Sequence, residues 1–493
     1  MTLGMKRFLL GGCQFRWLGL AQLATSLATA AVLAFAIAPT VASALAGDLR
    51  VHDPSTVVEC DGRYYVFSTG PGIPILSSDD GFTWTRSGHV FDKVPDSVHA
   101  AVPLNDGKLV WAPDAIKLNG EYYLYYSISK WGSNVSAVGL LTNPTLNDKD
   151  PKYKWTDRGL VVNSVAGESL NAIDPGVLHG PDGRLWLTYG SYIGNVQMVE
   201  LDPKTGLRIA KDSPATILSS ASEASDAIYH DGYYYLFVNR GSCCKGTAST
   251  YNIRMGRSRT PTGPYLDRYG VDMAHGGGSL FAASQGNHIG PGHFGLVAMD
   301  GVEKFSCHYE GNLATGGRGE LAIHPLLWGA DGWPSAGEDV KDGTYQMQSK
   351  RLGDVLEFGS TSATAPDRLH LGRYASTGNQ KWEFAAAGGG YYKIIESGTA
   401  NALEASAPQA STAAGAVGLA PYTGADSQLW KMDELSDGSY RVEAKTSRLA
   451  LAAATRSAGH DTTPAGVAPA GPVPASLKPY TGDDVQRWFL LAP

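Results

Sequence analysis

A turn-plus-strand pattern recurs along the first two thirds of the chain. In each copy, Asp or Asn precedes a glycine, and a short strand that alternates aromatic and aliphatic residues follows. Asp-Gly and Asn-Gly pairs beside alternating strands are typical of β-hairpins. Four clear copies start at Gly62, Gly120, Gly183 and Gly232, and a degenerate copy starts at Gly301. Short strands that recur at intervals of about 50 to 70 residues predict a five-bladed β-propeller over residues 47–336.

A second repeat follows in the remainder of the chain. The pattern Tyr-x5-Gln-x-Trp occurs three times, at residues 374–382, 422–430 and 480–488. Three such units of about 50 residues predict a β-trefoil over residues 343–493, in which each Gln-x-Trp packs into one shared core. A polar segment at residues 335–342 predicts a short linker. The predicted fold class is therefore all-β, a five-bladed β-propeller followed by a β-trefoil.

Residues 1–46 have the pattern of an export signal. Basic residues come first, an apolar run spans about residues 18–38, and the small-residue patterns Ala42-Ser43-Ala44 and Ala44-Leu45-Ala46 follow. This order favours a cleaved signal peptide and a secreted protein, with a membrane anchor as the alternative. Removing the segment takes away basic residues only, so the mature chain is more acidic than its formal net charge of −7. Because of this acidic charge, we do not expect the mature protein to bind nucleic acid or membranes. We also expect a monomer.

The residues that precede the turn glycines carry candidate chemistry. Nine residues before the first four glycines stand Asp53, Trp111, Asp174 and Glu223, and eight before Gly301 stands His293. Equivalent positions of successive blades are related by rotation about one axis, so these side chains are expected to meet at one end of the central channel. Turn residues that cap strands are the structural alternative. Three carboxylates at one place repel one another and resist burial, which favours a functional role.

Hydrolysis of a glycosidic bond requires two carboxyl groups on either side of that bond. Asp53 and Glu223 come from different blades, and a separation of about 6.5–9.5 Å would leave room for water and invert the configuration. Asp174 would raise the pKa of Glu223 by like-charge repulsion. Trp111 would provide a flat apolar face for a sugar ring. His293 either binds a cation in the channel or is hydrogen-bonded in a polar channel.

The segments around these residues resemble the family 43 glycoside hydrolases, and within them the endo-α-1,5-L-arabinanases. The matching segments occur in the family's order, and the adjacent thiols Cys243 and Cys244, either a strained pair or free, precede one of them. They are Val51-His-Asp53-Pro-Ser, Trp111-Ala-Pro-Asp114, Asn171-Ala-Ile-Asp174-Pro, Gly190-Ser-Tyr, Glu223-Ala-Ser225, Ser249-Thr-Tyr-Asn-Ile-Arg-Met-Gly-Arg-Ser258, Gly290-Pro-Gly-His293 and Trp328-Gly-Ala-Asp-Gly-Trp333.

The resemblance implies an inverting mechanism with Asp53 as general base, Glu223 as general acid and Asp174 orienting and tuning the acid. It implies a channel ion, usually calcium, at His293. It also implies a sugar-binding set comprising Trp111, Gly132, Asn134, Asn171, Ala172, Ile173, Asp174, Ser191, Tyr192 and Ile193. Ser225 and Ile193 depart from the family's common residues, and Ile193 leaves the shape of the groove open. Exo-acting α-L-arabinofuranosidase and β-xylosidase of the same fold are therefore alternatives, and a non-catalytic sugar-binding propeller is a third.

The C-terminal part resembles the ricin-type lectin modules of polysaccharide-degrading enzymes. Those modules usually bind sugar through an Asp after Leu, together with an aromatic residue and an amide before Gln-x-Trp. Here Glu357 and Glu404 follow Leu instead of Asp, and a purely structural trefoil is the alternative. The third repeat has Ala452 after Leu451 and is expected not to bind. The candidate lectin residues of the first two repeats are Glu357, Tyr374, Asn379, Glu404 and Tyr422. The expected partner of the whole protein is a plant cell-wall polysaccharide, arabinan.

Overall fold

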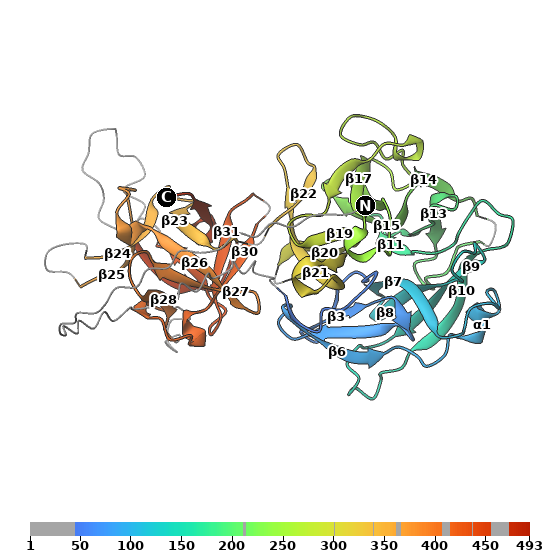
Figure 1. Cartoon of the computed structure of the whole chain (residues 1–493), viewed down its shortest axis with the longest axis horizontal. Helices are drawn as coiled ribbons and strands as arrows, with labels where there is room; N and C mark the ends of the chain where they lie inside the picture. Colours follow the sequence, from blue (N-terminus) through green and yellow to red (C-terminus); the bar gives the residue numbers. More distant parts are fainter. Residues whose placement is uncertain are drawn as a thin grey trace, which may run out of the picture. The chain divides into compact units, whose positions relative to one another are not determined.

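The structure is a computed structural model, which describes residues 45–210, 213–299, 301–338, 340–360, 366–406, 415–435, 437–454 and 473–493 (Figure 1). The predicted export signal lies outside the described residues except for Leu45 and Ala46. Among the described residues, no helix is long and apolar enough to cross a membrane.

Five separate sheets make up the N-terminal part, as the hairpin repeats predicted. The first sheet contains β1 (Ala46–Gly47), β2 (Val58–Cys60), β3 (Arg63–Phe67), β5 (Pro74–Ser78) and β6 (Thr83–His89). The second contains β4 (Gly70–Pro71), β7 (Leu109–Leu118), β8 (Glu121–Ile128), β9 (Ser136–Asn143) and β10 (Thr156–Ser164), and the helix α1 (Asp96–His99) lies between the two in sequence.

The other three sheets have four strands each, and their strands are paired in sequence order. The third contains β11 (Gly176–His179), β12 (Leu185–Tyr189), β13 (Asn195–Leu201) and β14 (Thr216–Ser220). The fourth contains β15 (Glu223–His230), β16 (Tyr233–Arg240), β17 (Asn252–Ser258) and β18 (Ser279–Ala282). The fifth contains β19 (His288–Met299), β20 (Val302–Asn312), β21 (Arg318–Trp328) and β22 (Pro334–Ala336).

The buried apolar side chains show that these sheets close into a ring. Four hydrophobic clusters each join two sheets that follow one another in sequence, and a fifth joins the last sheet to the first. In this closing cluster, Val66 and Trp84 of the first sheet pack with Val297 and Ile323 of the fifth. Alternating strands bury one face against each neighbouring blade, so a closed ring needs no separate central core. The prediction of a five-bladed propeller is confirmed.

The C-terminal strands form one sheet around a single core. They are β23 (Gly343–Ser349), β24 (Val355–Gly359), β25 (Arg368–Gly372), β26 (Trp382–Gly388), β27 (Tyr391–Glu396), β28 (Asn401–Ala405), β29 (Val417–Pro421), β30 (Trp430–Glu434), β31 (Tyr440–Ala444), β32 (Ala450–Ala453), β33 (Val473–Lys478) and β34 (Trp488–Leu491). β22 ends at Ala336 and β23 begins at Gly343, so residues 337–342 lie between the two repeat regions in sequence.

The three Gln-x-Trp motifs have equivalent contacts, as a trefoil requires. Trp382, Trp430 and Trp488 are fully buried in one cluster. Each indole Nε1 donates to a backbone carbonyl of the same repeat, at Leu356, Leu403 and Leu451 respectively. The amide oxygens of Gln380, Gln428 and Gln486 accept from the backbone N–H groups of Ala375, Thr423 and Thr481. The tryptophans therefore fill the core while the glutamines fix the turns that lead into it, and the trefoil prediction is confirmed.

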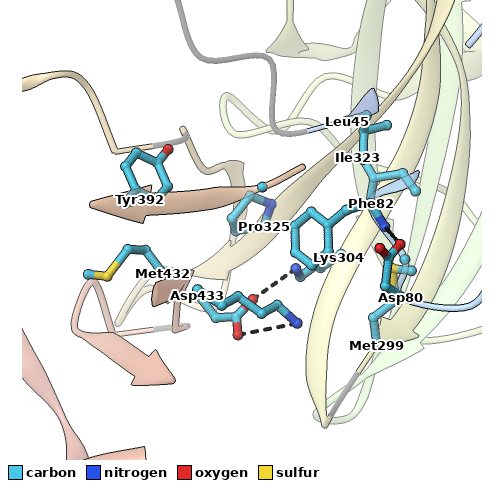
Figure 2. Close-up of a pocket in the computed structure, with 13 residues that line it drawn as sticks. Leu45, Asp80, Phe82, Met299, Lys304, Ile323, Pro325, Tyr392, Met432 and Asp433 are labelled. Carbon is cyan, nitrogen blue, oxygen red and sulfur yellow. Dashed lines mark hydrogen bonds and ion pairs between the residues drawn. The ribbon is translucent and has the colours of Figure 1, made fainter. Parts of the chain in front are cut away.

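A buried ion cluster lies beside a small pocket lined by residues from both repeat regions (Figure 2). Asp433 on β30 is 3.0 Å from Lys304 Nζ and 3.6 Å from Lys431 Nζ, and Arg441 binds it as well. Burial alone would raise the pKa of Asp433, but the three cations outweigh burial and hold it well below its usual value. Removing one partner of such a buried cluster leaves an uncompensated charge, so these residues stabilise the fold only as a set.

Candidate active site

Five non-glycine residues with a left-handed backbone surround one end of the channel. Their φ values lie between 40° and 62°, and each lies in, or a few residues before, the strand that leads to the turn glycine of its blade. They are Asp53, Ala112, Asp174, Ala224 and His293. A left-handed conformation is costly for residues with a Cβ, and clusters of such residues mark functional sites.

This ring corrects the repeat frame predicted from the turn glycines. Asp53, Asp174 and His293 occupy the left-handed position itself, whereas Trp111 and Glu223 each precede it by one residue. The ladder also shifts register at these places, between Trp111 and Asp114 and between Glu223 and Asp226. A β-bulge inserts an extra residue and redirects the neighbouring side chains. The five predicted residues are therefore neighbours at one end of the channel without being strictly equivalent.

Side-chain acceptors from neighbouring blades hold the strained backbone. The N–H of Asp53 donates to His308 Nδ1 at 2.9 Å, and that of Ala112 donates to Thr69 Oγ1 at 2.8 Å. The remaining pairs are Asp174 N with Ser127 Oγ, Ala224 N with Asp174 Oδ2, and His293 N with Asn239 Oδ1. A strained conformation persists only where its surroundings determine it, and these hydrogen bonds do so at all five positions.

Sequence reasoning missed these acceptors, although a signal for them exists. Thr69, Ser127, Asn239 and His308 are each the seventh residue after the turn glycine of their blade. In the third blade that position is Gly190, which has no side chain to offer. There the carboxylate of Asp174 takes over and accepts the N–H of Ala224. Asp174 therefore ties the backbone beside Glu223 to the neighbouring blade.

Asp53 lies in a cationic environment. Thr69 Oγ1 donates to its Oδ2 at 2.7 Å, while His293 Nδ1 and His52 Nε2 lie 3.4 Å and 3.6 Å from its Oδ1. Burial would raise the pKa of Asp53, but the imidazoles of His52, His293 and His308 hold it well below its ordinary value. These neighbours therefore favour the ionised form of the Asp53 side chain.

Glu223 lies in the opposite electrostatic environment. Burial, followed by the charges of Asp174 and Asp53, raises its pKa to about 8, although the hydroxyl of Tyr251 donates to its Oε1 at 2.9 Å. Burial and the charge of Asp53 likewise raise the pKa of Asp174 to about 7. Like-charge repulsion was predicted to keep Glu223 protonated, but burial is the larger cause. Tyr251 was part of a quoted motif and had no predicted role.

Exposed aromatic and aliphatic side chains lie near the carboxylates. Trp111 packs edge to face against Trp131 with ring centroids 6.1 Å apart, and Trp131 is 78% exposed. Gly132 follows with a left-handed φ of 77°. Tyr192 and Ile193 are 41% and 44% exposed. These surfaces are accessible to a sugar chain, and Trp131, which the sequence reasoning omitted, is the most exposed of them.

The other predicted sugar-binding residues are buried or occupied by internal hydrogen bonds. Asn171 accepts from Ser136 Oγ and donates to Ser191 Oγ, and all three side chains are buried. Ala172 and Ile173 are also buried. Asn134 donates to the carbonyls of Val165, Glu168 and Leu170. In this conformation Asn171, Ala172 and Ile173 form part of the wall of the site, and Asn134 holds the 165–170 loop. The exposed side chains form the accessible surface.

His293 has the features of a buried ligand. Its residue is 5% exposed, and its Nδ1 makes no well-directed hydrogen bond although it faces Asp53. An orphaned imidazole nitrogen in a polar channel fits a water-completed ion. A single nitrogen donor gives no preference for calcium, which favours oxygen ligands.

The trefoil residues predicted to bind sugar differ between the first two repeats. Glu357 is occupied by His370 Nε2, at 2.8 Å from its Oε1, and by the amide of Gln380. Asn379 donates to the carbonyl of Phe358. Glu404 accepts a hydrogen bond from Ser427 Oγ. Tyr374 and Tyr422 are 41% and 36% exposed. The tyrosines of both repeats are accessible, while the first carboxylate is already paired.

The comparisons with known proteins identify the class to which this fold and site belong. The family model of the glycosyl hydrolases family 43 matches residues 47–334, so the chain belongs to this family. A second model, the ricin-type beta-trefoil lectin domain-like family, matches residues 378–468. The chain is therefore a glycoside hydrolase with a lectin-type domain.

Three relatives illustrate the similarity. The extracellular exo-α-(1→5)-L-arabinofuranosidase of Cellvibrio japonicus (strain Ueda107) is 38% identical over 62% of this chain and 91% of its own length. The extracellular endo-α-(1→5)-L-arabinanase 1 of Bacillus subtilis (strain 168) is 35% identical over 63% and 96%. The solved exo-1,5-α-L-arabinanase from a bovine ruminal metagenomic library matches with a TM-score of 0.56 and 40% identity, over 59% of this chain and 97% of its own.

Proposed function

We propose that the protein is a secreted, inverting arabinanase that cleaves internal bonds of the polysaccharide α-1,5-L-arabinan. One observation carries the mechanism: the site pushes two pKa values apart, holding Asp53 ionised and Glu223 protonated at neutral pH. Opposed pKa values of this kind assign the base and the acid. Asp53 activates water, and Glu223 donates its proton to the leaving oxygen.

The exposed side chains near the carboxylates support a position for the polymer. Trp111 and Trp131 provide apolar faces for furanose rings, and Tyr192 and Ile193 form a second accessible surface. Endo action requires a groove open at both ends. Exo action is the second candidate, because two of the relatives with high identity are named as exo-acting. Product analysis on debranched linear arabinan separates them: the endo proposal predicts short arabino-oligosaccharides early in the reaction, and arabinose alone or activity on xylan alone would contradict it.

Asp174 tunes the acid, and its isosteric variant tests this role. Asp174→Asn keeps an oxygen that accepts the N–H of Ala224 but removes one of the charges that raise the pKa of Glu223. A lower pKa means that Glu223 loses its proton at lower pH. The alkaline limb of the kcat/KM profile, expected near pH 8 in the parent, should therefore move downward. An unchanged or upward-shifted limb would remove Asp174 from this role.

The trefoil is proposed to hold the enzyme on insoluble wall polysaccharide. Point variants test this better than removal of the domain, because removal would leave buried Lys304 without Asp433. Replacing the exposed Tyr374 and Tyr422 by Ala should weaken adsorption to insoluble arabinan and leave turnover of a soluble substrate unchanged. Tyr480→Ala in the third repeat is the matched control. Equal adsorption of all variants would make the trefoil purely structural.

The proposed enzyme also holds an ion in the channel of the propeller. His293 would hold the channel ion, calcium or another, which would add positive charge next to the ionised Asp53.

Secretion is supported by the export-signal pattern and by the extracellular naming of relatives. Leu45 is buried in the propeller, and Ala46 of β1 pairs with Thr83 of β6. Because both residues belong to the folded domain, cleavage after Ala44 is favoured. As a monomer, the enzyme would meet its cell-wall substrate without further subunits.

A further inference from the structure

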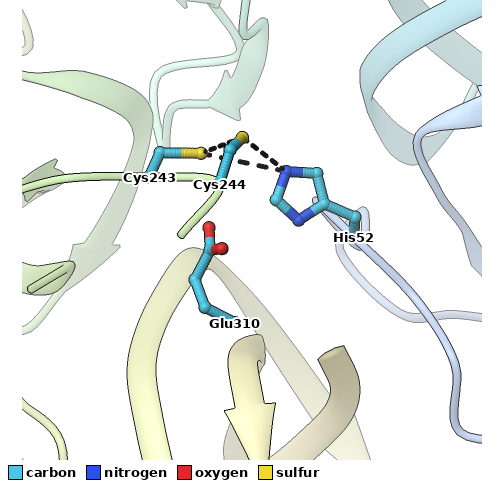
Figure 3. A group of neighbouring side chains, drawn as sticks. All are labelled: His52, Cys243, Cys244 and Glu310. Atoms are coloured by element: carbon cyan, nitrogen blue, oxygen red, sulfur yellow. Dashed lines mark hydrogen bonds between the residues drawn. The ribbon is translucent and has the colours of Figure 1, made fainter. Parts of the chain in front are cut away.

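Four side chains that carry metal-binding atoms lie together in one cluster (Figure 3). They are His52, which precedes Asp53, the adjacent Cys243 and Cys244 from the loop between β16 and β17, and Glu310 of β20. One donor atom from each lies within 4.8 Å of all the others. His52 also neighbours Asp53, whereas the two cysteines and Glu310 have no role in the proposed hydrolysis.

We propose that His52, Cys243, Cys244 and Glu310 form a binding site for a thiophilic divalent cation of the zinc type. Two sulfurs, one imidazole nitrogen and one carboxylate oxygen are a ligand set that zinc accepts in tetrahedral geometry. Calcium and magnesium prefer oxygen ligands, so the site is chemically distinct from the ion proposed at His293.

The distances and the state of the sulfurs support this assignment. His52 Nε2 lies 3.6 Å from Cys244 Sγ and 3.9 Å from Cys243 Sγ. Ligands bound at about 2.0–2.3 Å in a tetrahedron lie roughly 3.3–3.8 Å apart. The two sulfurs are 2.7 Å apart and must separate by about 1 Å to share an ion. Cys244 is exposed, so solvent and ions can reach its sulfur.

Glu310 provides an independent indication of a ligand. Its side chain is 3% exposed, and its Oε1 lies 3.5 Å from His308 Nε2 without a well-directed hydrogen bond, although the His308 imidazole still lowers the pKa of this carboxyl group. The backbone N–H of Cys244 donates to the same carboxylate, which ties the cysteine loop to β20. A buried oxygen without a hydrogen bond costs free energy unless a partner arrives. A cation between Glu310 and the two sulfurs would be that partner.

Binding exchanges protons for the ion. Each thiol loses its proton to solvent as its sulfur bonds to the cation, so one M²⁺ replaces two H⁺ and no electrons are transferred. The hydrogen bond from Cys243 and the imidazole of His52 lower the pKa of Cys244, so one of these protons is already weakly held. Because His52 also lies 3.6 Å from Asp53 Oδ1, an ion at this site is expected to inhibit hydrolysis.

Cobalt titration of the full-length, chemically reduced protein tests the site without reference to activity. Co²⁺ should produce an intense near-ultraviolet thiolate-to-cobalt band that saturates at about one equivalent, and Zn²⁺, but not Ca²⁺, should abolish it. Cys243→Ser and Cys244→Ser should each lose most of the band. Each should also weaken Zn²⁺ binding by more than the roughly 10–100-fold expected for a residue that only supports a ligand.

Cys60→Ser is the matched control, because Cys60 is a free, buried thiol whose contacts with Thr145 and Leu146 a hydroxyl can replace. It should bind Co²⁺ as the parent does. Zn²⁺ should inhibit the parent and Cys60→Ser, and the two loop variants should need at least ten times more Zn²⁺ for the same fractional inhibition. No thiolate band, a full band in both loop variants, or a Cys243–Cys244 disulfide that resists reduction would each overturn the proposal.

Discussion

Replacing Glu223 by Gln is expected to lower turnover of arabinan by about 10²–10⁴-fold, the usual contribution of a positioned proton donor. The amide keeps the size of the side chain and an oxygen for the hydroxyl of Tyr251, but it has no carboxyl proton to give. Cleavage of linear arabinan needs that proton because the leaving sugar oxygen is a poor leaving group. An aryl arabinoside with an acidic phenol leaves without it, so the loss should largely disappear on that substrate.

The comparison of the two substrates makes this result specific. A general defect of folding would reduce both rates together, and thermal unfolding of the variant provides a second check on the fold. An equal loss on arabinan and on the activated arabinoside would show that Glu223 is not the acid.

Replacing Asp53 by Asn should abolish turnover on both substrates, by at least the same 10²–10⁴-fold. The base acts on water and not on the leaving group, so an activated phenol cannot rescue the loss. Asn is the appropriate variant because it tolerates the left-handed backbone found at this position, with φ of 46°, and can still accept from Thr69. Asp53→Ala would combine loss of the base with backbone strain.

The pattern across the two variants assigns the roles. Rescue by the activated substrate is expected for Glu223→Gln alone. Rescue of Asp53→Asn by the phenol would contradict the assignment of Asp53 as the base, and Asp53→Asn with near-parent activity would remove it from the mechanism altogether.

The architecture could be predicted from sequence because repeats carry it. Hairpin glycines such as Gly62 and Gly120 recur once per blade, and Trp382, Trp430 and Trp488 recur once per trefoil unit. Each unit buries its apolar face only against its neighbours, so a period along the chain defines a closed arrangement in space. The same repeats brought the three carboxylates to one end of the channel.

The details of the site could not be predicted in this way. The bulges beside Trp111 and Glu223 depend on pairing between strands, which a frame counted from the turns does not contain. The burial that dominates the pKa of Glu223 comes from residues far apart in sequence. Asn171 and Ser191 are named by the family resemblance, but only the structure shows that they bind each other. The strand-end acceptors Thr69 and Ser127 were recognisable only after the strained N–H groups were seen.

The most direct test of the central claim is the configuration of the first product formed by the parent enzyme. Arabino-oligosaccharides linked α-1,5 are cleaved in an NMR tube, and the anomeric proton of the new reducing end is followed before mutarotation. With Asp53 as a base that delivers water and Glu223 as the acid, hydrolysis inverts the anomeric carbon. The β-anomer should therefore appear first and the α-anomer only later. An α-anomer formed first would mean retention through a covalent intermediate and would contradict the account.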